Sequence, residues 1–414
     1  MTSTTIPAPR PAALADAILG VVPRVVYSPA NVDECAEAMA QTASEKQRVA
    51  FIGGSTELGL GAAPGGLDAV VRSERMNRIL EYAPADMVIV AEAGVALAQL
   101  QAVAAEQHQR LALDPPHPDR ATIGGLVATG AYGPRRARYG AIRDLIIGVT
   151  IVRADGIVAR GGGKVVKNVA GFDLPKVACG SLGTLGMIAT ATFRLHPLPE
   201  ASATARFDAV PAEEVVALLA SVRQSQLEPA SAVAIHTSHG RYDLGVRFEG
   251  FAKGVQQQID RIVALGAAAQ TPCEPLGDGD AAAFWKRHDD VRGCGSLRVK
   301  VASLPSRFAG IDEFIAPILA ALRGGSFAWY GTLGLGFASG DVEDIAAAIA
   351  ALREAREALI RDGGSLVLEA APNEVRAVID PWGPAPGSFA IMEQLKLRFD
   401  PDRRLNRGRF VGGL

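Results

Sequence analysis

At residues 121–130 the sequence reads Ala121-Thr122-Ile123-Gly124-Gly125-Leu126-Val127-Ala128-Thr129-Gly130. A second stretch of the same character reads Gly180-Ser181-Leu182-Gly183-Thr184-Leu185-Gly186-Met187-Ile188. Residues 121–190 hold 14 of the 45 glycines in this chain of 414 residues. Glycine lets the backbone approach another group closely, because it carries no Cβ. This density predicts loops that lie directly against something flat or extended, rather than unrelated turns.

A third glycine loop lies upstream, where a predicted strand at 49–52 runs into Gly53-Gly54-Ser55-Thr56. Glycines after a buried strand allow consecutive N–H groups to converge in a concave nest that suits a diphosphate. The hydroxyls of Ser55 and Thr56 would add donors without any basic side chain. Taken alone the signal is weak, because a glycine turn is more often only a turn.

The loop matches neither of the common nucleotide motifs. No Gly-Lys-Ser/Thr follows it, so it is not a Walker A loop. The glycines at 59, 61 and 65 are spaced one residue too far apart for the dinucleotide fingerprint G-x-G-x-x-G. A nicotinamide-dependent dehydrogenase is therefore disfavoured.

The hydrophobic pattern predicts strands and helices in turn over the first half of the chain. Strands are expected at 25–28, 49–52, 87–91, 145–152, 157–160 and 189–195. Asn31 is expected to cap a helix, and another helix should bury Leu97, Leu100 and Ala104. Asp155-Gly156 predicts a tight hairpin turn.

Prolines at 197 and 199, followed by the polar stretch 200–206, predict a domain boundary. Beyond it, strands are expected at 231–236, 242–248 and 296–302 and helices near 251–265 and 308–322. Two short strands split by Gly331 should follow, and then a helix from Asp341 to Arg361 with Asp341 as its N-cap. This pattern predicts an α+β domain with a mainly antiparallel sheet.

Composition excludes several classes of protein. The 42 basic and 44 acidic side chains give a formal charge of −2, which disfavours a general nucleic-acid binder. The four cysteines include no C-x-x-C pair, which disfavours disulfides, zinc and iron–sulfur clusters and favours reduced thiols in a cytoplasmic protein. No run reaches the roughly 18 apolar residues of a spanning helix, so membrane contact is expected only through partners.

These motifs, in this order, resemble the FAD-binding domain of the vanillyl-alcohol oxidase family. The resemblance rests on Gly53-Gly54-Ser55, the 121–125 stretch, Tyr139-Gly140 with Asp144, and the 180–186 stretch. Within that family, Gly133-Pro134-Arg135-Arg136 and the segment from Lys167 to Asp173 are similar to the FAD-binding subunits of bacterial glycolate oxidases. The C-terminal segment resembles the family's closing D-P-x-x-x-x-N-P-G-R pattern, with Arg407 where the proline usually stands.

The resemblance implies an α+β fold with defined parts. A PCMH-type FAD-binding domain of two subdomains would cover 20–200, an α+β cap on the substrate side 201–395, and a segment returning to the flavin 396–414. It also implies non-covalent FAD held by a set of mostly small residues. That set is Gly53, Gly54, Ser55, Thr56, Pro115, Thr122, Gly124, Gly125, Gly130, Tyr139, Asp144, Gly180, Gly183, Thr184, Gly186, Ile188, Asn406 and Arg409.

The histidines depart from what relatives that oxidise 2-hydroxy acids alone would carry. Those relatives have a G-D-G-N-x-H segment and a later E-H-G, and this chain has neither. We expect no metal site. His236 and His239 are interpreted as a chance pair, and His288 as a residue of a helix surface. His117 is expected in an exposed loop, with covalent flavin attachment as the less favoured alternative.

A substrate carboxylate would need arginine or lysine, since a guanidinium can bind it through two hydrogen bonds. Arg298 and Lys300 are the weak candidates, because they share one face of a predicted strand. The alternatives for them are a cross-strand salt bridge and a solvated face. Arg135, Arg136 and Arg143 could equally form a docking surface for a partner subunit.

The leading hypothesis is an FAD-binding subunit of a glycolate or other 2-hydroxy-acid oxidase or dehydrogenase complex. The resemblance implies a larger flavin subunit with the metal–histidine site and an iron–sulfur subunit as partners. Substrate oxidation would occur mainly in the partner, and the complex would be cytoplasmic or peripheral at the inner face of the membrane. The alternatives are a self-sufficient FAD-dependent dehydrogenase of a small hydroxy acid or alcohol, and a non-catalytic scaffold subunit.

Overall fold

The computed structural model describes residues 8–164, 173–238 and 240–414, which form two compact units. The first unit contains the chain up to Gly133, Gly140–Leu198 and Pro384–Leu414. The second contains Pro134–Tyr139 and Pro199–Gly383. A six-residue segment thus leaves the first unit in the middle of its sequence, and the C-terminal residues rejoin it.

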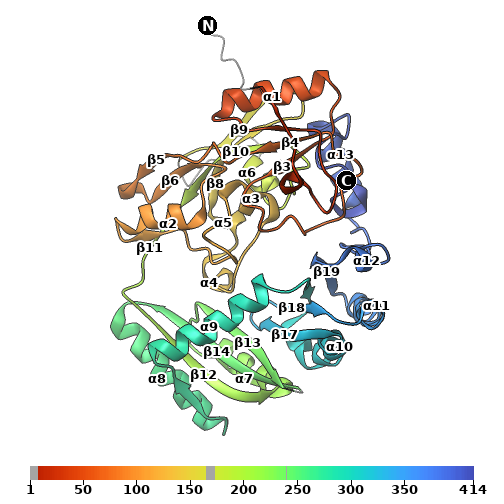
Figure 1. The fold of residues 1–414 in the computed structure, drawn as a ribbon. Coiled ribbons are helices and arrows are strands. Elements are labelled where there is room, and N and C mark those ends of the chain that lie inside the picture. The colour runs from red at the N-terminus through yellow and green to blue at the C-terminus, as the bar shows by residue number, and fades with distance from the viewer. Residues whose placement is uncertain (1–7, 165–172, 239) are drawn as a thin grey trace. The chain divides into compact units, whose positions relative to one another are not determined.

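The first unit contains a four-stranded and a five-stranded sheet (Figure 1). The four-stranded sheet has the order β1-β2-β4-β3, from Arg10–Pro11, Val25–Tyr27, Ala69–Arg72 and Val49–Ile52. The antiparallel five-stranded sheet has the order β5-β6-β10-β8-β9, from Ile79–Ala83, Val88–Glu92, Met187–Arg194, Ile146–Val152 and Val158–Gly162. A small pair joins β7 (Gln109–Arg110) to β11 (His196–Pro197).

The helices of this unit are α1 (Val32–Ser44), α2 (Leu97–Ala105), α3 (Ile123–Thr129), α5 (Ile142–Leu145), α6 (Leu174–Ala178) and α13 (Phe389–Phe399). Two of them, α1 and α2, were predicted from the sequence, and the others were not. The Asn31 side chain accepts a hydrogen bond from the Glu34 N–H at 2.9 Å, and α2 buries the three predicted residues. Gly156 adopts φ +83° in the turn between β8 and β9, as the hairpin prediction requires. These predictions are confirmed.

The second unit is built on an eight-stranded sheet of order β15-β12-β14-β13-β17-β18-β16-β19. The strands are Cys273–Pro275, Ala201–Pro211, Arg241–Gly250, Ser231–Ser238, Leu322–Tyr330, Leu335–Val342, Leu297–Ala302 and Ser365–Ala370. Every pair in it is antiparallel. The predicted α+β fold with a mainly antiparallel second sheet is confirmed.

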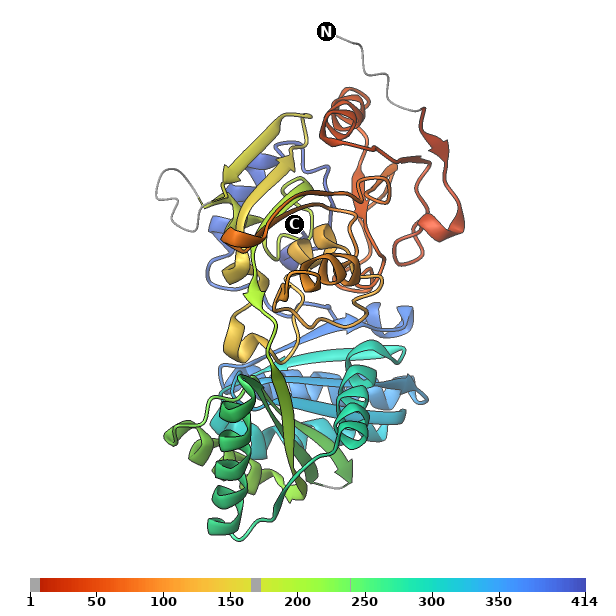
Figure 2. The ribbon, with the colours of Figure 1, turned by 90° about the vertical axis from the view of Figure 1, so that its left-hand side faces the viewer.

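Helices lie on both faces of this sheet. They are α4 (Arg136–Tyr139), α7 (Ala212–Gln224), α8 (Ala252–Ala268), α9 (Asp278–Gly293), α10 (Phe308–Ala320), α11 (Ile345–Arg361) and α12 (Asn373–Arg376). Leu244 points into the core, whereas a Cβ on Gly245 would meet Phe284 of α9, so α9 covers the opposite face. Figure 2 shows α8 in dark green and α9 in teal on opposite sides of the green strands.

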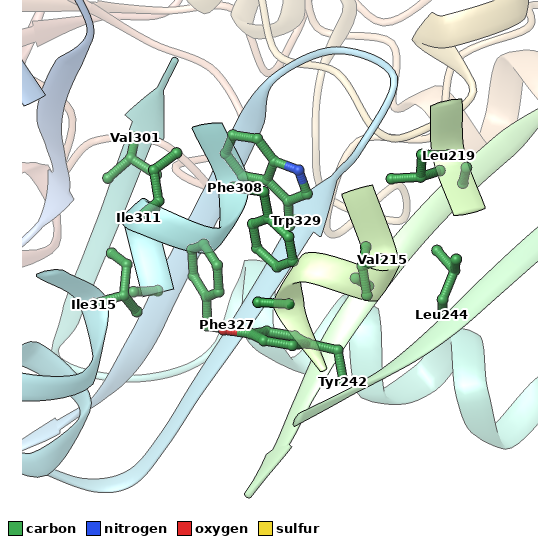
Figure 3. Packing of buried hydrophobic residues seen from close by; sticks show 14 of the residues in the cluster. Val215, Leu219, Tyr242, Leu244, Val301, Phe308, Ile311, Ile315, Phe327 and Trp329 are labelled. Carbon is green, nitrogen blue, oxygen red and sulfur yellow. The ribbon is translucent and has the colours of Figure 1, made fainter. Parts of the chain in front are cut away.

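The main core of this unit is aromatic and aliphatic (Figure 3). Trp329 and Phe308 stack with ring centroids 5.1 Å apart, and both are fully buried. Leu219 and Val215 of α7 lie at one end of this core, and Ile311 and Ile315 of α10 lie at the other end. This packing fixes α7 and α10 against the sheet.

Three predictions for this unit were wrong in their details. The polar stretch 200–206 belongs to the long strand β12, because its alternate residues are buried against α8. The strands on either side of Gly331 are nine and eight residues long rather than short. Asp344, not Asp341, caps α11, since the Asp341 carboxylate accepts the Ser296 N–H while still within β18.

Candidate flavin site

The loop after β3 carries a row of unused backbone donors. Within the described residues, the N–H groups of Gly53, Gly54, Ser55 and Thr56 donate no hydrogen bond to the protein. Ser55 adopts a left-handed φ of +61°, which turns the loop sharply. Unused N–H groups in such a turn are suited to hold an anion.

The loop is pressed against the segment that precedes α3. A Cβ on Gly53 would lie 2.2 Å from Thr122 Oγ1, and one on Gly54 would lie 1.6 Å from the Arg120 carbonyl oxygen. The Thr122 side chain also caps α3 by accepting from the Gly125 N–H at 3.4 Å. Glycine at 53 and 54 is therefore required by close packing within the protein, independently of any ligand.

The C-terminal segment contributes a buried acceptor without a partner. The Asn406 N–H donates to the Val49 carbonyl at 2.8 Å, and Asn406 Nδ2 donates to the Leu182 carbonyl at 2.7 Å. Asn406 Oδ1 is buried and has no hydrogen-bond partner within the described chain. A buried acceptor of this kind is costly unless a ligand satisfies it. It fits a bound donor, such as a nucleotide hydroxyl or ring N–H.

Arg409 supports the loop region rather than standing ready for a phosphate. Its guanidinium donates to the carbonyls of Leu58 and Leu60 at 2.8 and 2.7 Å. It is buried, and it thereby ties the C-terminal segment to the loop at 58–62. This side chain organises the wall of the site.

These groups line one pocket of about 80 Å³ in the first unit. That volume accommodates a diphosphate-sized portion, so the remainder of a dinucleotide would extend beyond it. Nine residues of the predicted set line this pocket: Gly53, Gly54, Ser55, Thr56, Thr122, Gly125, Gly183, Asn406 and Arg409. The pocket is also lined by residues that the sequence did not single out, among them Phe51, Pro116, Leu126, Thr129 and Leu182.

The other predicted cofactor residues lie elsewhere. Gly180 and Thr184 line a separate cavity of about 160 Å³ beside Lys396 and Phe410. A Cβ on Gly124 would meet Ala93, and one on Gly186 would meet Ile151, so both pack inside the unit. Pro115 and Ile188 are buried, Gly130 ends α3 at φ +65°, and Asp144 accepts the Ala141 N–H at the start of α5.

Tyr139 takes part in a contact of the second unit. Its hydroxyl donates to Glu249 Oε2 at 3.1 Å, and Arg135 binds Glu249 Oε1 at 2.8 Å. The Glu249 side chain is fully buried. Arg135 therefore has a structural partner, whereas Arg143 is exposed on α5.

Two buried cations fix the C-terminal segment, and sequence reasoning missed both. Lys396 Nζ donates to the carbonyls of Thr184 and Leu405, each at 2.8 Å, and to Asp400 Oδ2 at 2.7 Å. Burial lowers the pKa of Lys396, although Asp400 acts to raise it. Arg404 donates to the carbonyls of Thr42, Gln47 and Ala154. The only sequence signal was the Asp400-Pro401 motif.

In the second unit, Arg298 and Lys300 share the face of β16 that α9 partly covers. Arg298 is 9% exposed, and its Nη1 donates to the Arg292 carbonyl at 3.4 Å. Lys300 pairs in register with Phe337 of β18 and is half-buried. The two side chains are therefore neighbours, as predicted, in a partly desolvated environment.

The prediction for His288 was wrong, because this residue is buried rather than on a helix surface. Its Nε2 lies 2.6 Å from the Tyr330 hydroxyl, which also accepts from Arg292 Nη1 at 2.8 Å. Nδ1 lies 2.9 Å from Asp289 Oδ1. Desolvation by burial lowers the pKa of His288, although the contact with Asp289 acts to raise it.

The remaining histidine expectations have mixed outcomes. His117 is half-buried rather than exposed, with φ +55°, and its carbonyl closes a turn to Ala121. His236 meets Tyr242 edge to face, while His239 and residues 167–172 of the predicted motif fall outside the described residues.

Over the described part of the chain, no three histidine, cysteine or acidic side chains gather as metal ligands would. No helix there is both long and apolar enough to cross a membrane.

Comparison with known proteins identifies the first unit. A family profile described as FAD binding domain matches residues 23–162. The chain is 37% identical to glycolate oxidase subunit GlcE of Escherichia coli strain K12 over 171 residues, 41% of this chain and 48% of that protein. It is 39% identical to D-lactate dehydrogenase of Archaeoglobus fulgidus over 176 residues, 42% of this chain and 39% of that protein.

Other relatives and solved structures agree. D-2-hydroxyglutarate dehydrogenase of Xanthomonas citri pv. viticola is 28% identical over 247 residues, 60% of this chain and 48% of that protein. The chain thus spans about half or less of these relatives' own length. A solved alkyldihydroxyacetonephosphate synthase superposes with a TM-score of 0.72 at 17% identity, covering 95% of this chain and 78% of that one, and so shares the fold. The predicted FAD-binding domain is thus confirmed as a match of residues 23–162 to the profile described as FAD binding domain.

Proposed function

We propose that this chain is the FAD-binding subunit of an oxidoreductase complex that acts on glycolate or a similar 2-hydroxy acid. The observation that carries the proposal is the pocket where four unused N–H groups and the unpartnered Asn406 Oδ1 meet. The similarity to a glycolate oxidase subunit and to D-lactate and D-2-hydroxyglutarate dehydrogenases supports the substrate class.

Each group of the pocket receives a role in holding the cofactor without a covalent bond. The N–H groups of Gly53 to Thr56 bind the diphosphate, which needs no basic side chain there. Asn406 Oδ1 accepts a donor of the nucleotide, and Arg409 keeps the 58–62 loop in place through its carbonyl contacts. Gly180, Gly186, Ile188 and the other members of the predicted set shape the surrounding loops.

FAD, when bound, supplies an acceptor for the hydride of a hydroxy-acid α-carbon. Arg298 and Lys300 are the chain's own candidates for orienting a carboxylate, because both are cations on one partly buried strand face. Because the sequence lacks the two histidine segments of self-sufficient relatives, our proposal assigns the proton-accepting base to the larger flavin subunit. Electrons then pass to an iron–sulfur subunit.

We infer a cytoplasmic complex that reaches the inner face of the membrane through its other subunits. A second candidate function, a dehydrogenase active alone, is favoured by the Arg298–Lys300 pair itself. A non-catalytic scaffold without flavin would leave the N–H groups of residues 53–56 without a ligand to bind.

Anaerobic reduction of the flavin tests the proposal. The purified chain is mixed with glycolate or D-lactate, first alone and then with the co-expressed partner subunits, while flavin absorbance is followed. We expect bleaching only with the partners present. Bleaching by the chain alone, lost in Arg298→Met but kept in Arg361→Met, would establish the self-sufficient dehydrogenase instead. A chain that takes up no flavin would leave only the scaffold.

A further inference from the structure

The second unit contains a cavity of about 490 Å³ that no part of the proposed function uses. Its walls come from α7, from the loop carrying Leu227 and Pro229, and from the turn carrying Leu304 and Pro305. The volume falls within the range of small-molecule sites. Leu304 is 61% exposed and adds an apolar side chain to the accessible part of the lining.

The walls are apolar, with one charged side chain among the lining residues. That side chain is Arg223, in the last turn of α7, which is exposed and forms no hydrogen bond or ion pair with the described residues. The hydroxyls of Ser306 and Thr332 are the other polar side-chain groups of the lining. Among the described residues that line the cavity there is no carboxylate, histidine or thiol, so the lining suits binding rather than proton transfer.

The acidic residue next to the cavity is already neutralised. Glu228 lies between Leu227 and Pro229, and its carboxylate pairs with Arg138 at 3.2 Å. Arg138 Nη1 also donates to the Glu228 carbonyl at 2.7 Å. Glu228 therefore does not pair with Arg223, whose positive charge remains available at the edge of the cavity.

We propose that this cavity binds an amphipathic monoanion, a medium-chain alkyl or aryl carboxylate. Its apolar part lies against Val216, Leu219 and Leu304, and its carboxylate meets the Arg223 guanidinium. A neutral or cationic ligand of the same shape lacks that charge-assisted contact. A docked protein would need a far larger complementary surface than one cavity provides.

Calorimetric titration of the purified full chain with decanoate tests the site, with decanol and decyltrimethylammonium as probes of charge. We expect one saturable decanoate site per chain and binding of both other probes weaker by at least about tenfold. Arg223→Gln should weaken decanoate by about 10- to 100-fold and leave decanol unchanged. Arg361→Gln is the control, because it removes an exposed arginine from the last turn of another helix, α11.

A second pair of variants tests the walls. Ala220→Trp fills the cavity and should abolish decanoate binding, whereas Ala217→Trp changes an exposed residue of the same helix outside the lining and should leave it intact. Thermal unfolding followed by circular dichroism reports in each case that the chain is folded, and a loss of flavin absorbance alone would concern the first unit. Absence of saturable binding, equal affinity for decanoate and decanol, or unchanged binding by Ala220→Trp would overturn the proposal. If Ala220→Trp instead disrupted only assembly with a protein, the cavity would be a protein-docking surface.

Discussion

At the scale of single residues, close packing explains why certain positions tolerate no side chain. Gly54 lies so near the Arg120 carbonyl that a Cβ would stand 1.6 Å from its oxygen. The Arg120 N–H donates to the His117 carbonyl, which holds the Arg120 backbone in a turn. With alanine at position 54, the loop at 53–56 must therefore move instead. The unused N–H groups of residues 53–56 would then be displaced.

Gly54→Ala should therefore weaken FAD binding by about 10- to 100-fold, the equivalent of one to three kcal/mol of lost loop geometry. Fluorescence titration of the flavin-free protein measures the change. Gly254→Ala in α8 is the control, since a Cβ there meets nothing within 4 Å and alanine favours the helix. Equal affinity in the two variants would show that the loop does not bind the cofactor.

His288 gives the second unit a pH-dependent stability. Burial lowers its pKa below the unfolded value of about 6.5, so between those two values the unfolded chain binds more protons. Stability is full above about pH 6.5 and falls as the pH drops through that value towards the folded pKa.

We expect the melting temperature to fall between pH 7 and pH 5.5, and His288→Gln to reduce that fall. Differential scanning calorimetry at several pH values measures both. His108→Asn, at an exposed position with left-handed backbone, serves as the control and should behave as wild type. His196 is also half-buried with a lowered pKa, so some slope remains in His288→Gln. An identical slope in wild type and His288→Gln would disprove the assignment.

At the scale of elements, the buried Lys396 ammonium ties α13 to the rest of the first unit, because it donates to the Thr184 carbonyl at 2.8 Å. Lys396 is 2% exposed and Asp400 fully buried, four residues apart on the same helix face. Asp400 Oδ2 also accepts the Leu405 N–H at 2.7 Å, which positions the turn before Asn406. The buried pair thus connects the helix to the flavin pocket.

Lys396→Met should destabilise the protein by about 3–5 kcal/mol, because it leaves the Asp400 carboxylate buried without its partner. Thermal unfolding of the variant measures the loss. Lys286→Met breaks a pair with the same spacing, Lys286–Asp290, on the exposed surface of α9 and should leave the unfolding temperature unchanged. Similar losses in both variants would contradict the role given to burial.

Local signals in the sequence predicted elements well, and long-range contacts set the rest. Asn31 and Asp155-Gly156 act over a few residues, so their cap and turn could be predicted. His288 is buried by Tyr330, 42 residues further on, and Arg135 finds Glu249 114 residues away, which no local pattern reveals. Asp341 and Asp344 are equally good caps in sequence; the pairing of β18 with its neighbours decides between them.

The same distinction holds for the candidate site. The glycine loops could be predicted because close backbone approach requires glycine at 53 and 54. The sequence could not separate residues that line the pocket, such as Gly183, from those that pack behind it, such as Gly186, because both need the same small side chain. Asn406 was found through its motif, but the unpartnered state of its Oδ1 emerges only in three dimensions.

At the scale of the whole molecule, the near-neutral charge and the glycine-rich loops are both consistent with a cofactor bound through backbone N–H groups rather than through basic side chains. A formal charge of −2 offers no excess of cations for phosphate, and in our proposal the unused N–H groups of residues 53–56 supply the donors instead. Part of the first unit, residues 23–162, matches an FAD binding domain, and the second unit offers a partly buried cationic strand face and a separate apolar cavity.

The absorption spectrum of the purified chain, taken before and after acid precipitation, tests the central claim that these loops hold FAD without a covalent bond. We predict a two-banded flavin spectrum with one FAD per chain, and a colour that stays in the supernatant when the protein is precipitated. A chain that remains colourless after incubation with FAD, or a colour that follows the pellet, would contradict the account.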